Sequence, residues 1–154
     1  MSFPAVRALV SCLLASLVGL ASLSARAADS SPAIERRAAP DDAELYIISP
    51  GDGEAVKSPV TVRFGLRGMG VTPAGSDLPH TGHHHLLVDV TELPDGGMPI
   101  PADERHIHFG KGQTETTIEL APGEHTLQLL LGDFRHIPHD PIVVSERITI
   151  TVKP

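Results

Sequence analysis

Histidine is the residue best able to support chemistry in this 154-residue chain, because eight of its nine histidines fall into three short clusters. Neutral imidazole is the commonest metal ligand among side chains. Two of the clusters contain a His-x-His spacing, and side chains two residues apart in a strand point to the same side, so each pair could offer two nitrogens to one ion. We therefore predict a metal site whose ligands come from His83, His85, His106, His108, His136 and His139.

Copper and zinc are the ions that suit such a site, since both accept imidazole nitrogen and Cu(II) has the higher intrinsic affinity. Six ligands are too many for one ion, so three or four of the six would bind it and the others would support them or form a second site. The two remaining residues of interest are His84, which shares the apolar face of its strand with Leu86 and should be buried and hydrogen-bonded, and His125, which lies outside the clusters.

The elements that must position these histidines are short strands, because apolar alternation broken by Gly and Pro dominates the sequence after residue 44. Seven strands are predicted, at residues 45–49, 59–66, 83–90, 105–109, 114–120, 124–133 and 142–152. This pattern favours an all-β fold, an immunoglobulin-like seven-stranded β-sandwich, with a small barrel as the alternative. In such a sandwich the loops that carry the three histidine clusters gather at one end.

The first 27 residues are typical of a signal peptide. Arg7 precedes an apolar run over residues 8–23, and Ala25-Arg26-Ala27 has the A-x-A form of a cleavage site. The run is shorter than the ~20 residues of a membrane helix, so the mature chain should have no membrane span. We expect cleavage near Ala27 and export to the periplasm or the medium, followed by a flexible linker at residues 28–44 and one domain at residues 45–154.

Charge and cysteine content exclude several classes of protein. The full chain has a net charge of −7. The only charged residues that cleavage would remove are basic, so the mature chain would be more acidic still, and nucleic acid is not an expected partner. Cleavage would also remove the single cysteine, Cys12. Without cysteine the mature chain can form no disulfide framework, iron–sulfur cluster or blue-copper site.

Longer segments resemble a known family. The stretches SPGDGEAVKSPVTVRFGLRGMGVTPAG, TGHHHLLVDV, PIPADERHIHFGKGQTE and GEHTLQLLLGDFRHIPHDP are similar to the bacterial exported domain of unknown function DUF4399. The resemblance covers residues 45–152 and implies a single exported domain, but it supplies no activity. It matches the family's histidine pattern at His83, His84, His85, His106, His108, His136 and His139.

The favoured function is a periplasmic module that binds copper or zinc. The alternative is a structural or protein-interaction module of the cell envelope, in which the histidines form a hydrogen-bonded cap and the partner is another envelope protein. A third hypothesis is an enzyme, such as a redox copper enzyme resembling Cu/Zn superoxide dismutase or a hydrolase with Glu104 or Asp133 as base, which we expect less than a binding role. Because imidazole must be neutral to bind metal, the sequence predicts that affinity falls between about pH 7 and 5.

Overall fold

The structure is a computed structural model that describes residues 34–154; the predicted signal peptide and the first part of the predicted linker lie outside the described residues. The described chain is all-β, as predicted, and forms two sheets. The smaller sheet has the order β1-β3-β7, with β1 at Glu44–Ser49, β3 at Val60–Arg67 and β7 at Glu115–Ile118.

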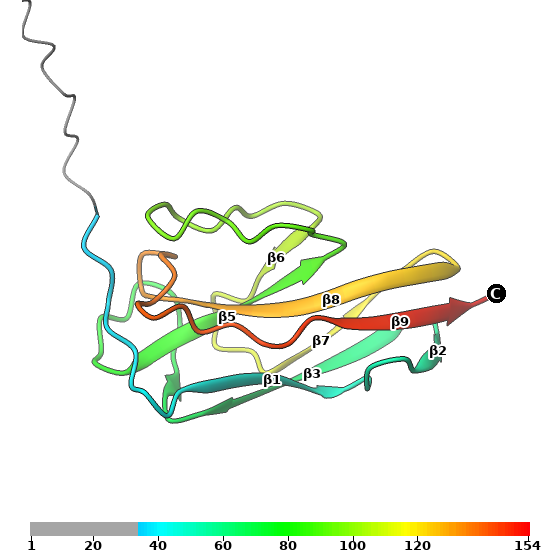
Figure 1. The fold of residues 1–154 in the computed structure, drawn as a ribbon, viewed down its shortest axis with the longest axis horizontal. Coiled ribbons are helices and arrows are strands. Elements are labelled where there is room, and N and C mark those ends of the chain that lie inside the picture. Colours follow the sequence, from blue (N-terminus) through cyan, green and yellow to red (C-terminus); the bar gives the residue numbers. More distant parts are fainter. Residues whose placement is uncertain (1–33) are drawn as a thin grey trace, which may run out of the picture. The chain divides into compact units, whose positions relative to one another are not determined.

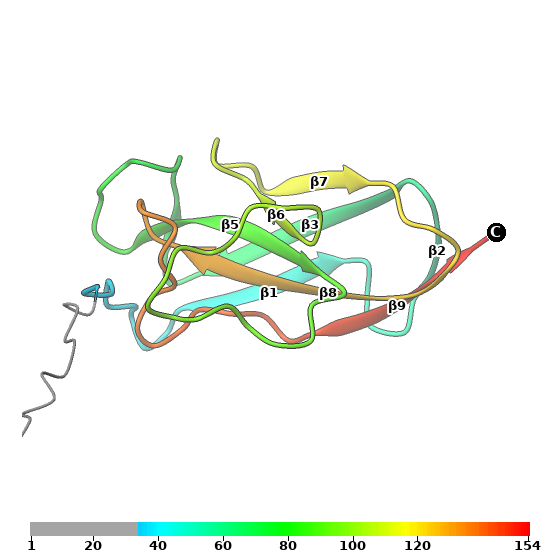
Figure 2. The same ribbon diagram turned by 90° about the horizontal axis from the view of Figure 1, so that it is seen from above.

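The larger sheet has the order β2-β9-β8-β5-β4, and β6 also pairs with β5. Its strands are β2 (Ala55–Lys57), β9 (Ile148–Lys153), β8 (Gly123–Gly132), β5 (Thr81–Val88), β4 (Gly70–Val71) and β6 (His106–His108). The two sheets and the strands that form them can be followed in Figure 1 and, from above, in Figure 2.

The number of strands differs from the prediction: the described residues form nine strands instead of seven. The two additional strands are β2, of three residues, and β4, of two. Each is a strand because it pairs in parallel with a distant segment, β2 with β9 and β4 with β5. Such non-local pairing leaves no local alternation to detect, so the sequence pattern missed both strands.

The main core lies between the two sheets and consists of aliphatic side chains and two phenylalanines. Alternation along β5 and β8 sends every second residue toward this core, including Leu86, Leu129 and Leu131, all 0% exposed. His84 lies on the same face, where its ring packs on Phe64 at 5.1 Å and its Nδ1 lies 3.1 Å from the carbonyl oxygen of Gln113. The prediction that His84 is buried and hydrogen-bonded is confirmed.

A second, smaller core covers the opposite, outer face of the larger sheet. Leu87 from β5 and Leu130 from β8 pack there with Val90 and Ile100, which belong to the long loop between β5 and β6. Figure 1 shows this loop running over the strands of the larger sheet. Strand β5 is therefore buried on both faces, and the outward-facing residues of β5 lie beneath a loop instead of in solvent.

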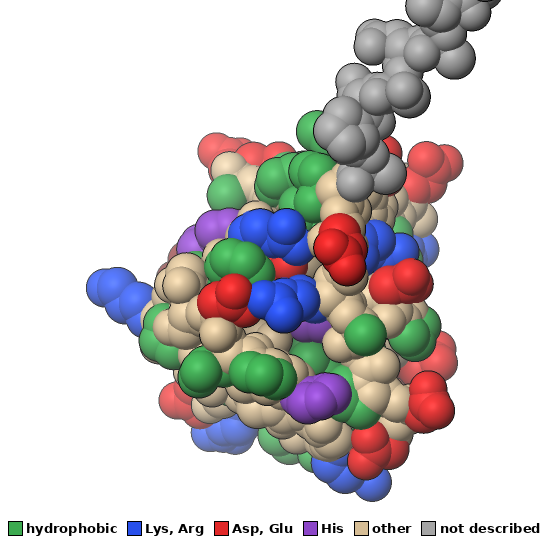
Figure 3. Space-filling model, turned by 90° about the vertical axis from the view of Figure 1, so that its left-hand side faces the viewer, with side chains coloured by type: hydrophobic (Ala, Val, Ile, Leu, Met, Phe, Trp, Pro, Cys, Tyr) green, Lys and Arg blue, Asp and Glu red, His purple; other side chains and the backbone are tan. Residues whose placement is uncertain are grey.

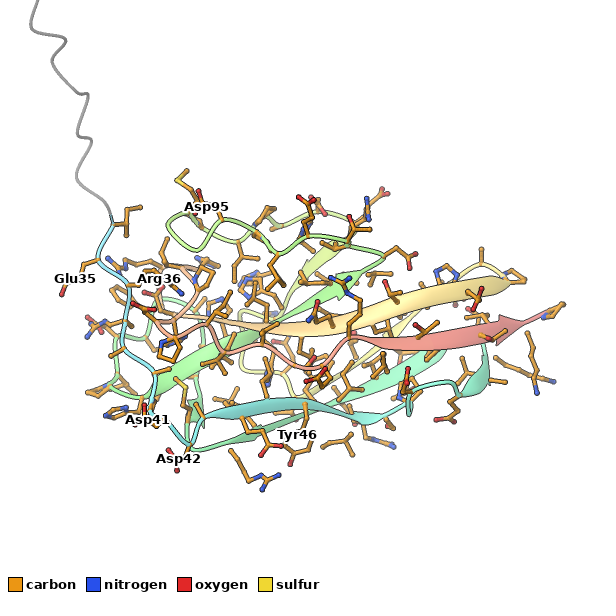
Figure 4. All side chains as sticks on the ribbon, viewed as in Figure 1. Glu35, Arg36, Asp41, Asp42, Tyr46 and Asp95 are labelled. Atoms are coloured by element: carbon orange, nitrogen blue, oxygen red, sulfur yellow. The ribbon has the colours of Figure 1, made fainter. Side chains whose placement is uncertain are left out.

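The described part of the predicted linker, from residue 34 onward, lies against the domain. The backbone N–H of Ala39 donates to the carbonyl oxygen of Asp140 at 2.9 Å, and the N–H of Asp140 donates to the carbonyl oxygen of Arg37 at 2.8 Å. Figure 4 labels Glu35 and Arg36 in this segment, beside the loop that follows β8. No helix that could cross a membrane occurs in the described residues.

Candidate metal centre

Strand β5 supplies the two most deeply buried histidines of the candidate centre. His83 and His85 lie two residues apart on the outer face of β5, and both are 0% exposed. Their ring centroids are 4.8 Å apart. The His-x-His spacing therefore does what the sequence predicted: it brings two imidazoles side by side on one face of a strand.

Strand β6 and the loop after β8 add one histidine each. The antiparallel pairing of β5 and β6 places His108 opposite His85, and Ile107 points the other way, toward the main core. His136 comes from the loop at residues 133–140 and is partly exposed, with a left-handed backbone at φ 70°. We refer to His83, His85, His108 and His136 as the four-histidine centre.

The four rings lie close together, and three of them, His83, His85 and His108, could hold a single ion. Five of the six centroid separations lie between 4.8 and 5.2 Å, and the sixth, His85 to His136, is 6.1 Å. A metal bound tetrahedrally by four imidazoles at ~2.1 Å would hold their centroids about 5.2 Å apart. Candidate ligand nitrogens of His83, His85 and His108 also lie within 4.8 Å of one another.

Five ring nitrogens of the centre are buried without hydrogen-bonding partners among the described residues. Both nitrogens of His83, both of His85 and Nε2 of His108 have no partner among the described residues. A buried polar group left unpaired costs about 1–3 kcal/mol, so native folds rarely keep several together. An ion bound between the rings would take one nitrogen from each of His83, His85 and His108, and this donor set fits a metal.

Burial also favours the neutral form of three of these imidazoles. Burial, together with the neighbouring His136 and His108, lowers the pKa of His83 from 6.5 to about 4. Burial, with His83, His108 and His136, lowers the pKa of His85 to about 2, and burial also lowers the pKa of His108. His83 and His85 are thus neutral, the form that can bind a metal, well below pH 6.5, so a loss of metal affinity through their protonation would occur at a lower pH than the sequence alone suggests.

Two of the six predicted ligands are not brought into this group. His106 faces outward opposite Leu87, and its Nδ1 lies 2.9 Å from Oδ1 of Asp103. His139 is buried in the loop after β8, and its Nε2 lies 3.2 Å from the carbonyl oxygen of Thr81. Each of these two rings has a protein partner of its own.

The loop that carries His136 is organised by a buried carboxylate. Asp133, 1% exposed, accepts hydrogen bonds through Oδ1 from the backbone N–H groups of Arg135 and Ile137, and through Oδ2 from the Arg135 guanidinium. The N–H of Ile100 donates to the carbonyl oxygen of His136 at 2.8 Å, which ties this loop to the loop between β5 and β6. Asp133 thus positions His136 through the backbone.

Two glycines leave space for ligand rings. A Cβ on Gly132 would lie 2.8 Å from Cε1 of His85, and a Cβ on Gly110 would lie 2.7 Å from Nε2 of His108. Neither distance is compatible with ordinary van der Waals packing, so a larger residue would displace the ring. These two positions shape the centre without touching an ion.

Sequence reasoning missed the outer core and the parts of the site that depend on it: Ile100, Gly110, Gly132 and the contacts of Arg36. A signal was present, because Leu86-Leu87-Val88 and Leu129-Leu130-Leu131 are continuous apolar runs, and such runs indicate strands buried on both faces.

Figure 3 shows the end of the molecule near the loops, where basic and acidic side chains are interspersed and histidine forms only small separate patches. This view agrees with the burial of the centre.

Comparison with known proteins identifies the family of this two-sheet fold with its histidine cluster. The family model of DUF4399, a domain of unknown function, matches residues 62–153, which is more than half of the chain. The chain therefore belongs to the DUF4399 family. Searches of curated proteins and of solved structures gave no match.

Proposed function

We propose that this chain is an exported β-sandwich module that binds one transition-metal ion, zinc or copper, through His83, His85, His108 and His136. One observation carries the proposal: four imidazole rings lie with their centroids 4.8–6.1 Å apart, and three of them have buried ring nitrogens without partners among the described residues. Metal coordination would compensate the cost of burying one nitrogen of each of these three rings.

Zinc is the ion that the arrangement favours. A square-planar Cu(II) site with four imidazoles needs two opposite pairs with centroids about 6.4 Å apart and four adjacent pairs about 4.5 Å apart. Only one of the six separations is long, at 6.1 Å, and the pair opposite it, His83 and His108, is separated by 5.0 Å. Copper retains the advantage of intrinsic affinity, so both ions belong in the test.

A binding role is favoured over catalysis because the centre offers four protein ligands. Catalytic zinc sites keep three protein ligands and leave the fourth position to water or substrate. In this proposal His136 takes the fourth position; its ring centroid lies 4.8–6.1 Å from those of the other three rings. We propose that the chain works in the periplasm, where the predicted signal peptide would direct it, and that the module holds or delivers the ion.

The alternative, a protein-interaction module with a hydrogen-bonded histidine cap, is less well supported. Such a cap requires the imidazoles to bond to one another or to the backbone. Five ring nitrogens of His83, His85 and His108 have no such bond among the described residues. The contacts of the centre therefore favour a bound ion over a cap.

Equilibrium dialysis of the tag-free protein against Zn(II) and against Cu(II) tests the proposal. We expect one ion per chain and a Kd well below about 10⁻⁵ M, at least for zinc. His83→Ala/His85→Ala should abolish this binding, and His125→Ala should preserve it as the matched control. A Kd above about 10⁻⁵ M for both metals would remove the proposed function.

A further inference from the structure

The segment just before the first strand contacts both loops that cover the four-histidine centre. Nε of Arg36 donates to the carbonyl oxygen of Pro138 at 3.0 Å, and Nη2 donates to the carbonyl oxygen of His139. Nη1 also lies 3.5 Å from Oδ1 of Asp140. One guanidinium thus binds three consecutive residues that follow His136 in its loop.

The same guanidinium lies against the loop between β5 and β6. A Cβ on Gly96 would be 3.2 Å from Cζ of Arg36 and 3.3 Å from its Nη1, so the glycine backbone and the guanidinium are in close proximity. This second loop contributes Ile100, whose N–H donates to the carbonyl oxygen of His136. Arg36 therefore bridges the two segments that determine where the His136 ring lies.

The neighbouring residues strengthen this attachment. Nη2 of Arg135 donates to the carbonyl oxygen of Glu35 at 2.7 Å, and Ala38 forms a bridge with Asp140. Arg36 is also shielded, with its side chain 26% exposed, whereas Arg67, which pairs with Glu44 on the surface, is 67% exposed. A shielded, multiply bonded arginine holds its partners more firmly than a solvated surface pair.

We infer that Arg36 is a positioning residue of the metal centre: it holds the loop of His136 in place and so controls how fast the ion leaves. This inference rests on the proposed function. His83, His85 and His108 are fixed by the pairing of β5 with β8 and β6, whereas His136 is fixed only by its loop and what binds that loop. Releasing the loop should therefore affect the fourth ligand and leave the other three in place.

The test is a double-mutant cycle on the rate at which zinc leaves the zinc-loaded protein after addition of excess chelator. We expect Arg36→Ala to raise this rate about tenfold, in the range observed for residues that orient metal ligands. Arg67→Ala, the matched surface control, should leave the rate unchanged, and Arg36→Lys should restore part of the retention.

The decisive comparison is made in the His136→Ala protein, where zinc would be held by three histidines. If Arg36 acts through His136, Arg36→Ala should add nothing to the rate in that background. A merely structural role would make the two effects additive, and that result would overturn the inference. So would a wild-type rate for Arg36→Ala alone, whereas a wild-type protein that binds no zinc would remove the proposed function and this inference with it.

Discussion

Histidines at the two ends of β8 have opposite environments. Near the start of β8, Nδ1 of His125 lies 2.8 Å from Oδ2 of Asp89 and Nε2 lies 2.9 Å from the carbonyl oxygen of Ala121. At the other end, where Gly132 pairs with His83, the rings of the four-histidine centre contact one another and their buried nitrogens have no partners among the described residues. Both ring nitrogens of His125 have partners, whereas five ring nitrogens of the centre have none among the described residues.

The pKa values follow the same division. The hydrogen bond to Asp89 raises the pKa of His125, whereas burial lowers the pKa of His83 and of His85. Protonation therefore strengthens the hydrogen bond of His125 to Asp89, whereas protonation of His83 or His85 places an unfavourable buried charge in the centre. His125 thus has polar partners and a raised pKa, whereas His83 and His85 have lowered pKa values and no partner among the described residues.

The largest expected effect comes from removing a ligand of the centre. His85→Ala should weaken zinc binding roughly 100-fold or more, since a structural zinc site distributes about 10–16 kcal/mol over its ligands. His125→Ala should leave zinc affinity unchanged, because its ring bonds to Asp89 and Ala121 at the opposite end of β8. Isothermal titration with Zn(II) measures both constants, and equal losses in the two variants would contradict the division between the two ends.

The second prediction concerns the stability of the metal-free protein in acid. Burial lowers the pKa of His83 and of His84 from 6.5 to about 4, so the unfolded chain binds more protons than the folded chain between these values. Stability contributed by the neutral rings is complete above pH 6.5 and is lost as pH falls toward 4. The titration of His83 and that of His84 should each lower the free energy of unfolding by roughly 2 kcal/mol at pH 4.5. Together these losses correspond to a decrease in Tm of more than about 10 °C.

Thermal unfolding of the metal-free protein between pH 7.5 and pH 4.5 checks this expectation. Zinc should raise Tm at the higher pH and lose its effect only after the buried rings titrate. His125 acts in the opposite sense, since its raised pKa means that its contribution is present at low pH and is lost as pH rises through that pKa. A Tm that is constant over this range would show that the buried histidines do not control acid stability.

A smaller effect is expected from crowding a ligand ring without altering any ligand. A Cβ on Gly110 would lie 2.7 Å from Nε2 of His108, so Gly110→Ala should displace the ring and weaken zinc binding about tenfold. Gly51→Ala is the matched control, because the added Cβ would lie 3.8 Å from its nearest atom, Oε2 of Glu54. If both glycine variants bind zinc as the wild type does, His108 does not occupy the position assigned to it.

The smallest effect is expected for His106, one of the two predicted ligands that lie outside the four-histidine centre. His106 lies opposite Leu87 and its Nδ1 is 2.9 Å from Oδ1 of Asp103. His106→Ala should therefore change zinc affinity less than about threefold, within the usual range for a surface substitution. A loss comparable to that of His85→Ala would place His106 among the ligands and would require Asp103 and the start of β6 to move.

Much of the fold could be predicted from local patterns. Alternation along residues 124–133 and 83–90 indicated strands, assigned His84 to the apolar face and predicted that His83 and His85 share the other. Strands β2 and β4 could not be predicted, because they consist of three and two residues and exist through pairing with β9 and β5. Pairing between segments that are distant in the sequence leaves no pattern within either segment.

The candidate site was predicted only in part, because some of its features also depend on contacts between segments that are distant in the sequence. Clustering and spacing indicated the histidines, but they could not distinguish His108 from His106, because both lie on one face of β6 and only the register with β5 separates them. His136 and His139 differ through the turn that Asp133 stabilises, which depends on burial of its carboxylate. The contribution of Arg36 depends on contacts over a sequence separation of 102 residues, for which the sequence offers no local signal.

The most direct measurement of the central claim is a crystal structure of the zinc-loaded protein with anomalous diffraction data collected at the zinc edge. The account predicts one anomalous peak between the rings of His83, His85, His108 and His136, about 2.0–2.1 Å from one nitrogen of each. A peak elsewhere, such as beside Asp103 and His106, or no peak in crystals of protein saturated with zinc, would contradict it.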